Sequence, residues 1–231
     1  MTRPRSAAPK IRPALPEAYR AVYETHYREN RDGGSPASAM AQRFEAWMHR
    51  TIAADAQASN PGATLEIGAG TLNQLPYEPF TAPYDIVEPF NALYQDRTEL
   101  RRVRHCFTDI SQVPADSRYA RITSIATFEH LTDLSATVQH CQRLLTPTGE
   151  LRVAIPNEGH WPWTAAWRVS TGLEFWLRHR LDYAVLMRHE HLNSADEIAA
   201  ELRARFPLVQ ERWFGFSRTL SLYRVFFARA G

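Results

Sequence analysis

Two glycines, Gly68 and Gly70, form a turn directly after an apolar run that begins at Thr64, and the segment as far as Leu72 reads T-L-E-I-G-A-G-T-L. Because glycine carries no Cβ, the backbone N–H groups of such a turn can approach a ligand closely, and a positive φ costs little. Glu88 ends the next apolar run. A strand, a glycine turn and a carboxylate at this spacing indicate a pocket for an adenosine-containing cofactor at the carboxyl edge of a parallel sheet.

The rest of this turn argues against a dinucleotide. A dinucleotide-binding turn has a third glycine that allows close packing of helix on strand, and Asn73 stands there in this chain. Pro76, Pro79 and Pro83 then disfavour a long regular helix before the next strand. A pyrophosphate would therefore find no well-formed helix N-terminus. S-adenosylmethionine (SAM) has no phosphate and needs a tight turn, an acid for its ribose and a polar contact for adenine.

Five motifs, in order along residues 64–228, resemble those of the class I SAM-dependent methyltransferases. They are Leu65–Gly70, Glu88, Phe107–Ile110, Ile122–Leu131 and Leu144–Leu151, the last a turn before a fifth strand at Arg152–Pro156. Three positions depart from the family pattern without removing a cofactor contact: Leu72 and Thr148 replace glycines, and Ala120 replaces an aspartate. The resemblance implies an α/β, Rossmann-like fold whose mostly parallel sheet ends in an antiparallel hairpin.

The same resemblance implies the cofactor contacts. Glu88 would hold the ribose hydroxyls, and Asp109 would meet the adenine amine. Tyr23, His26 and Tyr27 share one helix face, and their aromatic rings either close over the sulfonium or pack as an ordinary amphipathic helix. The expected cofactor-binding residues are Tyr27, Glu66, Gly68, Ala69, Gly70, Thr71, Glu88, Pro89, Asp109, Ile110, Thr127 and Phe128.

Methyl transfer to a hydroxyl or thiol needs a base within hydrogen-bond reach of the acceptor atom. His130, preceded by Glu129, follows the fourth strand at the carboxyl edge and is the first candidate. The second is His191, with Asn193 as a substrate-orienting partner. For both sites the alternative is that these residues only shape their loops. The spacing of His189 and His191 could supply two metal ligands, but no third ligand is identifiable from the sequence, so we expect no metal site.

The organisation along the chain predicts a tail and lid helices over residues 1–60 and a SAM-binding domain over 61–231. The first lid helix is expected at Pro16–Arg28, and Met1–Pro16 as a disordered tail. The expected segments that follow are a second lid helix carrying Met40, Phe44, Trp47 and Met48, a helix near Asp133–Leu145, a helix beginning at the capping box Ser194–Glu197, and a hairpin of Leu208–Phe214 and Leu220–Ala228.

An insertion at residues 158–190 is rich in tryptophan, leucine and arginine. Three interpretations stay open for it. In the first it is a cap that lines the binding site of a bulky, apolar acceptor. In the second it is an ordinary core or dimer face, and in the third an element that meets a membrane surface. The first is favoured.

Composition sets the remaining limits. A chain of 231 residues with a formal charge of +2 fits one domain and carries no field that would attract nucleic acid. Cys106 and Cys141 fall in predicted core segments, which suggests a reduced, cytoplasmic protein. No apolar run reaches membrane-spanning length, and the N-terminus lacks the apolar core of a secretory signal.

The sequence therefore predicts a SAM-dependent methyltransferase for a small acceptor, with oxygen favoured over nitrogen or carbon, acting as a monomer or homodimer. The rivals are a non-catalytic binding or membrane-associated module on the same fold, and an NAD(P)-dependent reductase.

Overall fold

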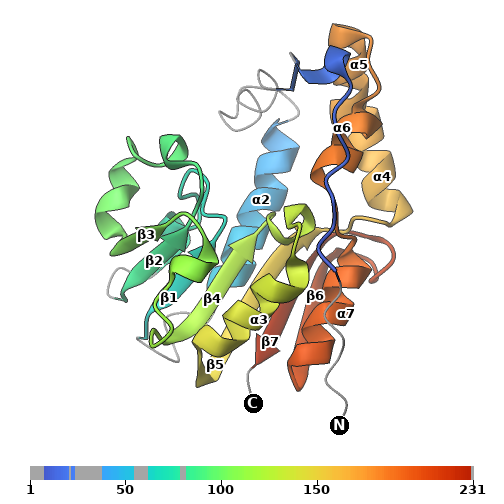
Figure 1. Cartoon of the computed structure of the whole chain (residues 1–231). Coiled ribbons are helices and arrows are strands. Elements are labelled where there is room, and N and C mark those ends of the chain that lie inside the picture. Colours follow the sequence, from blue (N-terminus) through green and yellow to red (C-terminus); the bar gives the residue numbers. More distant parts are fainter. Residues whose placement is uncertain (1–7, 21, 24–37, 55–61, 79–81, 230–231) are drawn as a thin grey trace.

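The computed structural model describes residues 8–20, 22–23, 38–54, 62–78 and 82–229. Its centre is a seven-stranded sheet in the order β3-β2-β1-β4-β5-β7-β6 (Figure 1). The strands are β1 (Thr64–Ile67), β2 (Tyr84–Val87), β3 (His105–Phe107), β4 (Tyr119–Ile125), β5 (Leu145–Pro156), β6 (Leu208–Gly215) and β7 (Ser221–Arg229). Strands β1 to β5 are parallel, and β7 is antiparallel to both β5 and β6. This confirms the expected mostly parallel sheet with a closing hairpin.

The central strands end level with one another. Ile67, the last residue of β1, pairs with Val87 of β2 and with Ser124 of β4. Both β1 and β2 are buried along their whole length, as expected for strands covered on two faces. Every loop that follows a parallel strand therefore leaves from the same edge, and this carboxyl edge is where candidate site residues can meet.

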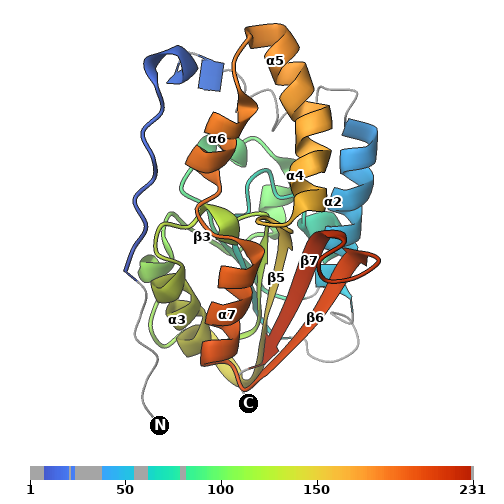
Figure 2. The same ribbon diagram turned by 90° about the vertical axis from the view of Figure 1, so that its right-hand side faces the viewer.

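Helices cover the two faces of the sheet unequally. Helices α3 (Leu134–Leu144) and α7 (Ala195–Arg205) lie on one face, and α2 (Ser38–Ala53) lies on the other (Figure 2). Met48 and Ile52 of α2 pack against β5 and β7. The predicted helix at α3 is confirmed, and the predicted capping box starts α7, where the Ser194 hydroxyl accepts from the Glu197 N–H and the Glu197 carboxylate accepts from the Ser194 N–H.

The crossovers among β1, β2, β3 and β4 contain only short 3-10 helices within the described residues: Leu75–Tyr77, Asn91–Leu93, Thr98–Arg102 and Ile110–Gln112. Pro76 stands in the first turn of the first of them, where its missing N–H costs nothing. The predicted lack of a regular helix after β1 is confirmed for the part of this crossover that the structure describes.

The insertion forms helices that rise from the carboxyl edge of the sheet (Figure 1). They are α4 (Trp161–Trp167), a π-helical segment (Arg168–Gly172), α5 (Leu173–His179) and α6 (Tyr183–Glu190). Arg180, with φ +58°, turns the chain back between α5 and α6. Phe175, Leu186 and Tyr19 form a small apolar cluster of their own, so the N-terminal segment around Tyr19 packs on the insertion.

Two sequence-based expectations are wrong. Cys106 is exposed, because β3 is an edge strand whose first two side chains are not covered, whereas Cys141 is buried as expected. Strand β5 begins at Leu145, not at Arg152, because Leu145 pairs with Tyr119 before the register shifts and resumes at Glu150. The expected turn is therefore an irregularity inside a longer strand.

The expected disordered tail is also wrong for the residues that the structure describes. The Lys10 N–H donates to the Thr132 carbonyl at 2.7 Å, so this segment is held against the domain. Residues 17–20 and 22–23 are helical, as predicted; the rest of that helix, with His26 and Tyr27, lies outside the described residues. Within the described residues, no helix combines the length and apolarity needed to cross a bilayer.

Candidate active site

The turn after β1 has the backbone that its glycines predict. Gly68 and Gly70 have φ values of +72° and +51°, and Leu72 has +66°. A Cβ on Gly68 would lie 2.1 Å from the Thr127 Oγ1, so no other residue fits there without displacing the loop after β4. A Cβ on Gly70 would meet no atom within 4 Å. The turn is therefore tightly supported at Gly68 and open at Gly70, as a backbone that faces a ligand must be.

Glu88 lies beside this turn. One of its carboxylate oxygens accepts the Gly70 N–H at 2.9 Å and the other accepts the Phe90 N–H at 3.0 Å. These bonds fix the carboxylate, which is only 4% exposed. Each carboxylate oxygen can accept a second hydrogen bond, so Glu88 keeps the capacity to receive two ribose hydroxyls. The residues present thus fit a nucleoside cofactor at this turn.

The other predicted cofactor residues differ in burial and in where their side chains lie. Glu66 points into the interior, where it accepts the Tyr84 hydroxyl at 2.9 Å. Burial raises the pKa of Glu66 to about 8, against the opposing effect of that hydrogen bond. Asp109 is exposed after β3 and accepts the Ser111 N–H at 2.8 Å.

Five further residues complete the predicted set. Ala69, Ile110 and Phe128 are buried, Thr71 is half-buried and Pro89 is exposed. The structure therefore brings Gly68, Gly70, Glu88 and Thr127 together at the turn. The predicted contacts of Glu66 and of the more distant residues stay predictions.

Three predicted catalytic residues converge next to this turn. Glu129 and His130 follow Thr127 on a 3-10 helix, Phe128–His130, and His191 follows α6. One potential ligand atom from each lies within 4.8 Å of the others. The two imidazole rings stand edge to face with centroids 4.9 Å apart. We call these three residues the carboxylate–histidine cluster.

Hydrogen bonds orient both rings of the cluster. The Nδ1 of His130 lies 2.9 Å from the Glu190 carbonyl oxygen, and the Nδ1 of His191 lies 2.7 Å from a Glu158 oxygen. The Trp163 indole N–H donates to the same Glu158 oxygen at 2.8 Å. A tryptophan of the insertion is thus coupled to the cluster through one carboxylate.

The charges of the cluster are mutually dependent. Burial raises the pKa of Glu129 to about 7, opposed by the nearby charge of His191. Burial lowers the pKa of His191, but the Glu158 hydrogen bond and the surrounding carboxylates outweigh it, so the net shift is upward. Glu129, with its pKa of about 7, and His191, with its raised pKa, are therefore placed to hold or release a proton.

The loop that carries His191 is docked by backbone contacts. The Leu192 and Asn193 N–H groups donate to the Glu129 carbonyl, at 2.7 and 3.0 Å. The Asn193 side-chain amide donates to the carbonyls of Phe128 and Leu131. Asn193 is 2% exposed, so its amide holds the loop after β4, and the substrate-orienting role expected for it is not supported.

Sequence reasoning missed the clamp formed by Lys10 and Arg12. The Arg12 guanidinium donates to the His130 carbonyl at 2.9 Å and to the His189 carbonyl at 2.6 Å. Lys10 donates to the Leu192 carbonyl at 2.8 Å. Two basic residues in a proline-rich tail carry no pattern that would have revealed these long-range contacts. We call this segment, residues 10–12, the N-terminal clamp.

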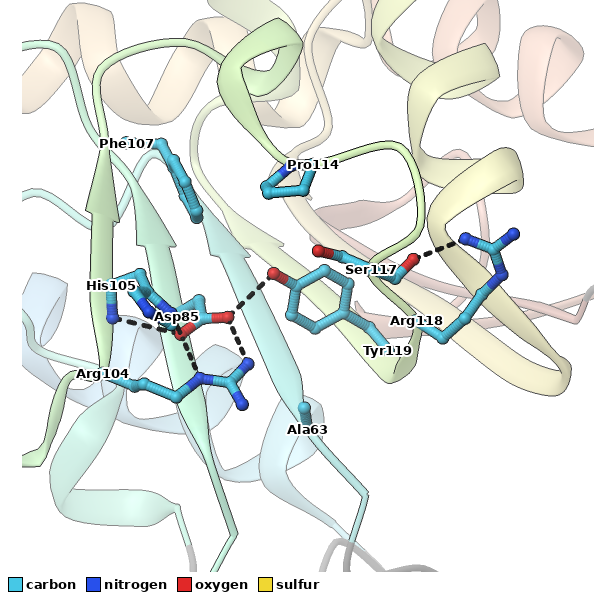
Figure 3. Close-up of a pocket in the computed structure, with 9 residues that line it drawn as sticks. All are labelled: Ala63, Asp85, Arg104, His105, Phe107, Pro114, Ser117, Arg118 and Tyr119. Carbon is cyan, nitrogen blue, oxygen red and sulfur yellow. Dashed lines mark hydrogen bonds and ion pairs between the residues drawn. The ribbon is translucent and has the colours of Figure 1, made fainter.

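A pocket of about 370 Å³ lies elsewhere, toward the amino ends of the strands (Figure 3). Asp85 on its floor accepts from the Arg104 guanidinium at 2.6 Å and from the Tyr119 hydroxyl at 2.8 Å. Its acid is therefore fully engaged, and the pocket stands apart from the glycine turn. We assign it a structural role.

Comparisons with known proteins agree with this geometry. A family model described as a methyltransferase domain matches residues 39–205. No curated protein sequence matches the chain. Among solved structures, the chain is similar to the CurJ carbon methyltransferase, with 23% identity, a TM-score of 0.56, and coverage of 80% of this chain and 54% of that one. The chain thus spans about half the length of that protein.

Two other structures match along nearly their whole length. The plantazolicin methyltransferase BpumL, in complex with S-adenosylhomocysteine (SAH), shares 12% identity with a TM-score of 0.59, covering 93% of this chain and 99% of that one. A SAM-dependent methyltransferase from Thermotoga maritima shares 14% identity with a TM-score of 0.59, covering 93% and 98%. At such identities these matches show the fold. Because the family model matches more than half of the sequence, the chain belongs to the methyltransferase-domain family and is a class I SAM-dependent methyltransferase.

Proposed function

We propose that the chain transfers a methyl group from SAM to a hydroxyl of a small, apolar or aromatic acceptor. The carboxylate–histidine cluster carries this proposal. Glu129 of this cluster is separated by one residue from Thr127, whose side chain touches the glycine turn. The groups able to activate an acceptor therefore stand beside the cofactor cradle. Transfer to oxygen, rather than to an unprotonated amine, is the reaction that requires such groups.

In this proposal SAM, when bound, supplies the activated methyl carbon. Gly68, Gly70 and Glu88 would hold its nucleoside and fix its orientation. His130 or His191 would accept the proton of the acceptor hydroxyl, and Glu129 would stabilise the resulting positive charge. Alignment of the two reactants accounts for most of the rate in such a displacement.

We further propose residues 158–190 as the cap over the acceptor and residues 1–60 as the lid. The Trp163–Glu158–His191 connection supports the cap, because it joins the aromatic insertion to the cluster. Trp176 and Leu177 remain 48% and 57% exposed, so these two side chains are available to a bulky apolar acceptor, a second copy or a lipid surface. Binding of the chain to liposomes without any methyl transfer would favour the rival, a membrane-associated module.

The test compares His130→Ala with His189→Ala. His189 lies on α6, two residues before His191, and its Nδ1 is 2.6 Å from the Pro13 carbonyl oxygen. We expect His130→Ala to reduce turnover by about 10²–10⁴-fold while SAH affinity, measured by calorimetry, stays within about twofold of wild type. His189→Ala should retain turnover. Wild-type turnover in His130→Ala would exclude His130 as the base.

A further inference from the structure

The carboxylate–histidine cluster contains a buried acceptor atom that lacks a partner. Glu129 is 1% exposed, and its Oε2 has no hydrogen-bond partner among the described residues. A buried carboxylate oxygen left without a bond costs free energy that a fold does not normally accept without compensation. We propose that Glu129, His130 and His191 bind one divalent transition-metal cation, which this oxygen would help to coordinate.

The spacing of the ligand atoms supports this proposal. All three lie within 4.8 Å of one another, and the Nε2 of His130 lies 3.9 Å from the Glu129 Oε1. Imidazole nitrogens and carboxylate oxygens bind such cations at about 2.0–2.2 Å, so two ligands on one ion stand up to about 4 Å apart. Small side-chain rotations are enough to close the set around an ion.

The surroundings of the two histidines are those of metal ligands. A ligating imidazole typically engages its other ring nitrogen with a carboxylate or a backbone carbonyl, which fixes the tautomer and the ring orientation. Here the Nδ1 of His191 meets the Glu158 carboxylate and the Nδ1 of His130 meets the Glu190 carbonyl. In each ring Nε2 is then the ligand atom, and both rings are held before any ion arrives.

The donor set defines the class of cation. Two imidazoles and one carboxylate suit zinc, manganese and iron(II), whereas magnesium and calcium prefer oxygen ligands alone. Three protein ligands also leave a coordination position for an exogenous oxygen. The role of the ion, though not its binding, rests on the proposed function. An acceptor hydroxyl coordinated to the ion would release its proton to solvent more readily, and the resulting alkoxide or phenolate would take the methyl group while SAH leaves. The ion would then replace the imidazole as the activating group.

The experiment uses the untagged, chelator-stripped full chain. We expect calorimetry with Zn²⁺ to show one site per chain, and Co²⁺ to develop visible absorption bands at the same stoichiometry. His191→Ala and Glu129→Gln should each weaken Zn²⁺ binding at least 100-fold. Glu158→Gln, which removes only the support behind His191, should weaken it by about 10–100-fold. His189→Ala is the matched control and should bind Zn²⁺ like wild type.

Circular dichroism and SAH calorimetry on each variant establish that the fold and the cofactor site persist. If Glu129→Gln does not fold, the Zn²⁺ affinity of Glu158→Gln tests the proposal instead, because the Glu158 carboxylate is partly exposed. A stoichiometry near zero would overturn the proposal, and so would equal weakening by His189→Ala and His191→Ala. The two proposals can be distinguished. Zn²⁺ binding without methyl transfer would support the metal site and contradict the proposed function. Methyl transfer without Zn²⁺ binding would support the proposed function and contradict the metal site.

Discussion

At the scale of single residues, Gly68 and Gly70 are required in the same turn for two different reasons. Gly68 satisfies packing, since a Cβ there would overlap the Thr127 side chain. Gly70 satisfies ligand approach, since a Cβ there meets no protein atom within 4 Å. The sequence pattern marks both as parts of one motif but does not distinguish the two roles, because Thr127 comes from another strand's loop.

Alanine substitutions should therefore have different consequences. Gly70→Ala places an alanine at φ +51°, which should cost about 1–2 kcal/mol of stability, and it should lower SAH affinity at least tenfold because the methyl group enters the cradle. Gly68→Ala should cost more, on the order of 2–4 kcal/mol, because the clash adds to the same backbone strain. Denaturant unfolding and SAH calorimetry measure the two effects. Unchanged SAH affinity in a folded Gly70→Ala would contradict the cradle.

The buried Glu66 predicts a pH dependence of stability. Its folded-state pKa of about 8 lies above the ordinary value of 4.5, with burial as the main cause. Below about pH 4.5 both states hold the proton, and between the two values the folded state holds more, so its contribution to stability is lost as pH rises toward 8. The effect is on the order of a few kcal/mol.

Glu66→Gln removes this titration while keeping an oxygen for the Tyr84 hydroxyl. We expect the stability of the variant relative to wild type to increase between pH 5 and pH 9 in urea unfolding experiments. A constant difference across that range would show that Glu66 stays ionised in the fold.

At the scale of elements, the sequence shows where strands and helices lie better than it shows which of them meet. The glycine turn, the helix at α3 and the capping box of α7 depend on local patterns, and all three are confirmed. The exposure of Cys106 could not be predicted, because it depends on β3 being an edge strand. The proximity of His191 to Glu129 and His130 could not be predicted either, because the loop after β4 and the end of α6 are joined only by tertiary contacts.

The N-terminal clamp joins these same two elements. Arg12 donates to carbonyls on both sides of the cluster, at His130 and His189. Arg12→Ala would leave these carbonyls with fewer donors, so we expect a stability loss of about 1–3 kcal/mol and faster amide exchange in residues 129–131 and 189–193. Lys10→Ala should have a smaller effect, because the Lys10 side chain is more exposed than that of Arg12. Equal protection in wild type and Arg12→Ala would show that the clamp does not order the site.

At the scale of the whole molecule, the candidate site residues lie along one rim of the sheet. The glycine turn, Glu88, Glu129 and His130 follow the carboxyl ends of parallel strands. The insertion, whose last helix leads into His191, rises from the same edge (Figure 1). The pocket around Asp85 lies toward the other ends of the strands (Figure 3). This separation lets the acceptor side change through its loops and insertion while the sheet that holds the cofactor stays constant.

The uncovered edge strand β3 gives this molecule a natural attachment point for a reporter dye. The chain has two thiols, one on the surface at Cys106 and one enclosed at Cys141. Burial raises the pKa of both, so maleimide should label the native protein slowly, with one dye per chain, and the unfolded protein with two. Cys106 precedes Asp109 by three positions, so a fluorophore there would test the predicted contact of Asp109 with adenine without any mutation of the protein.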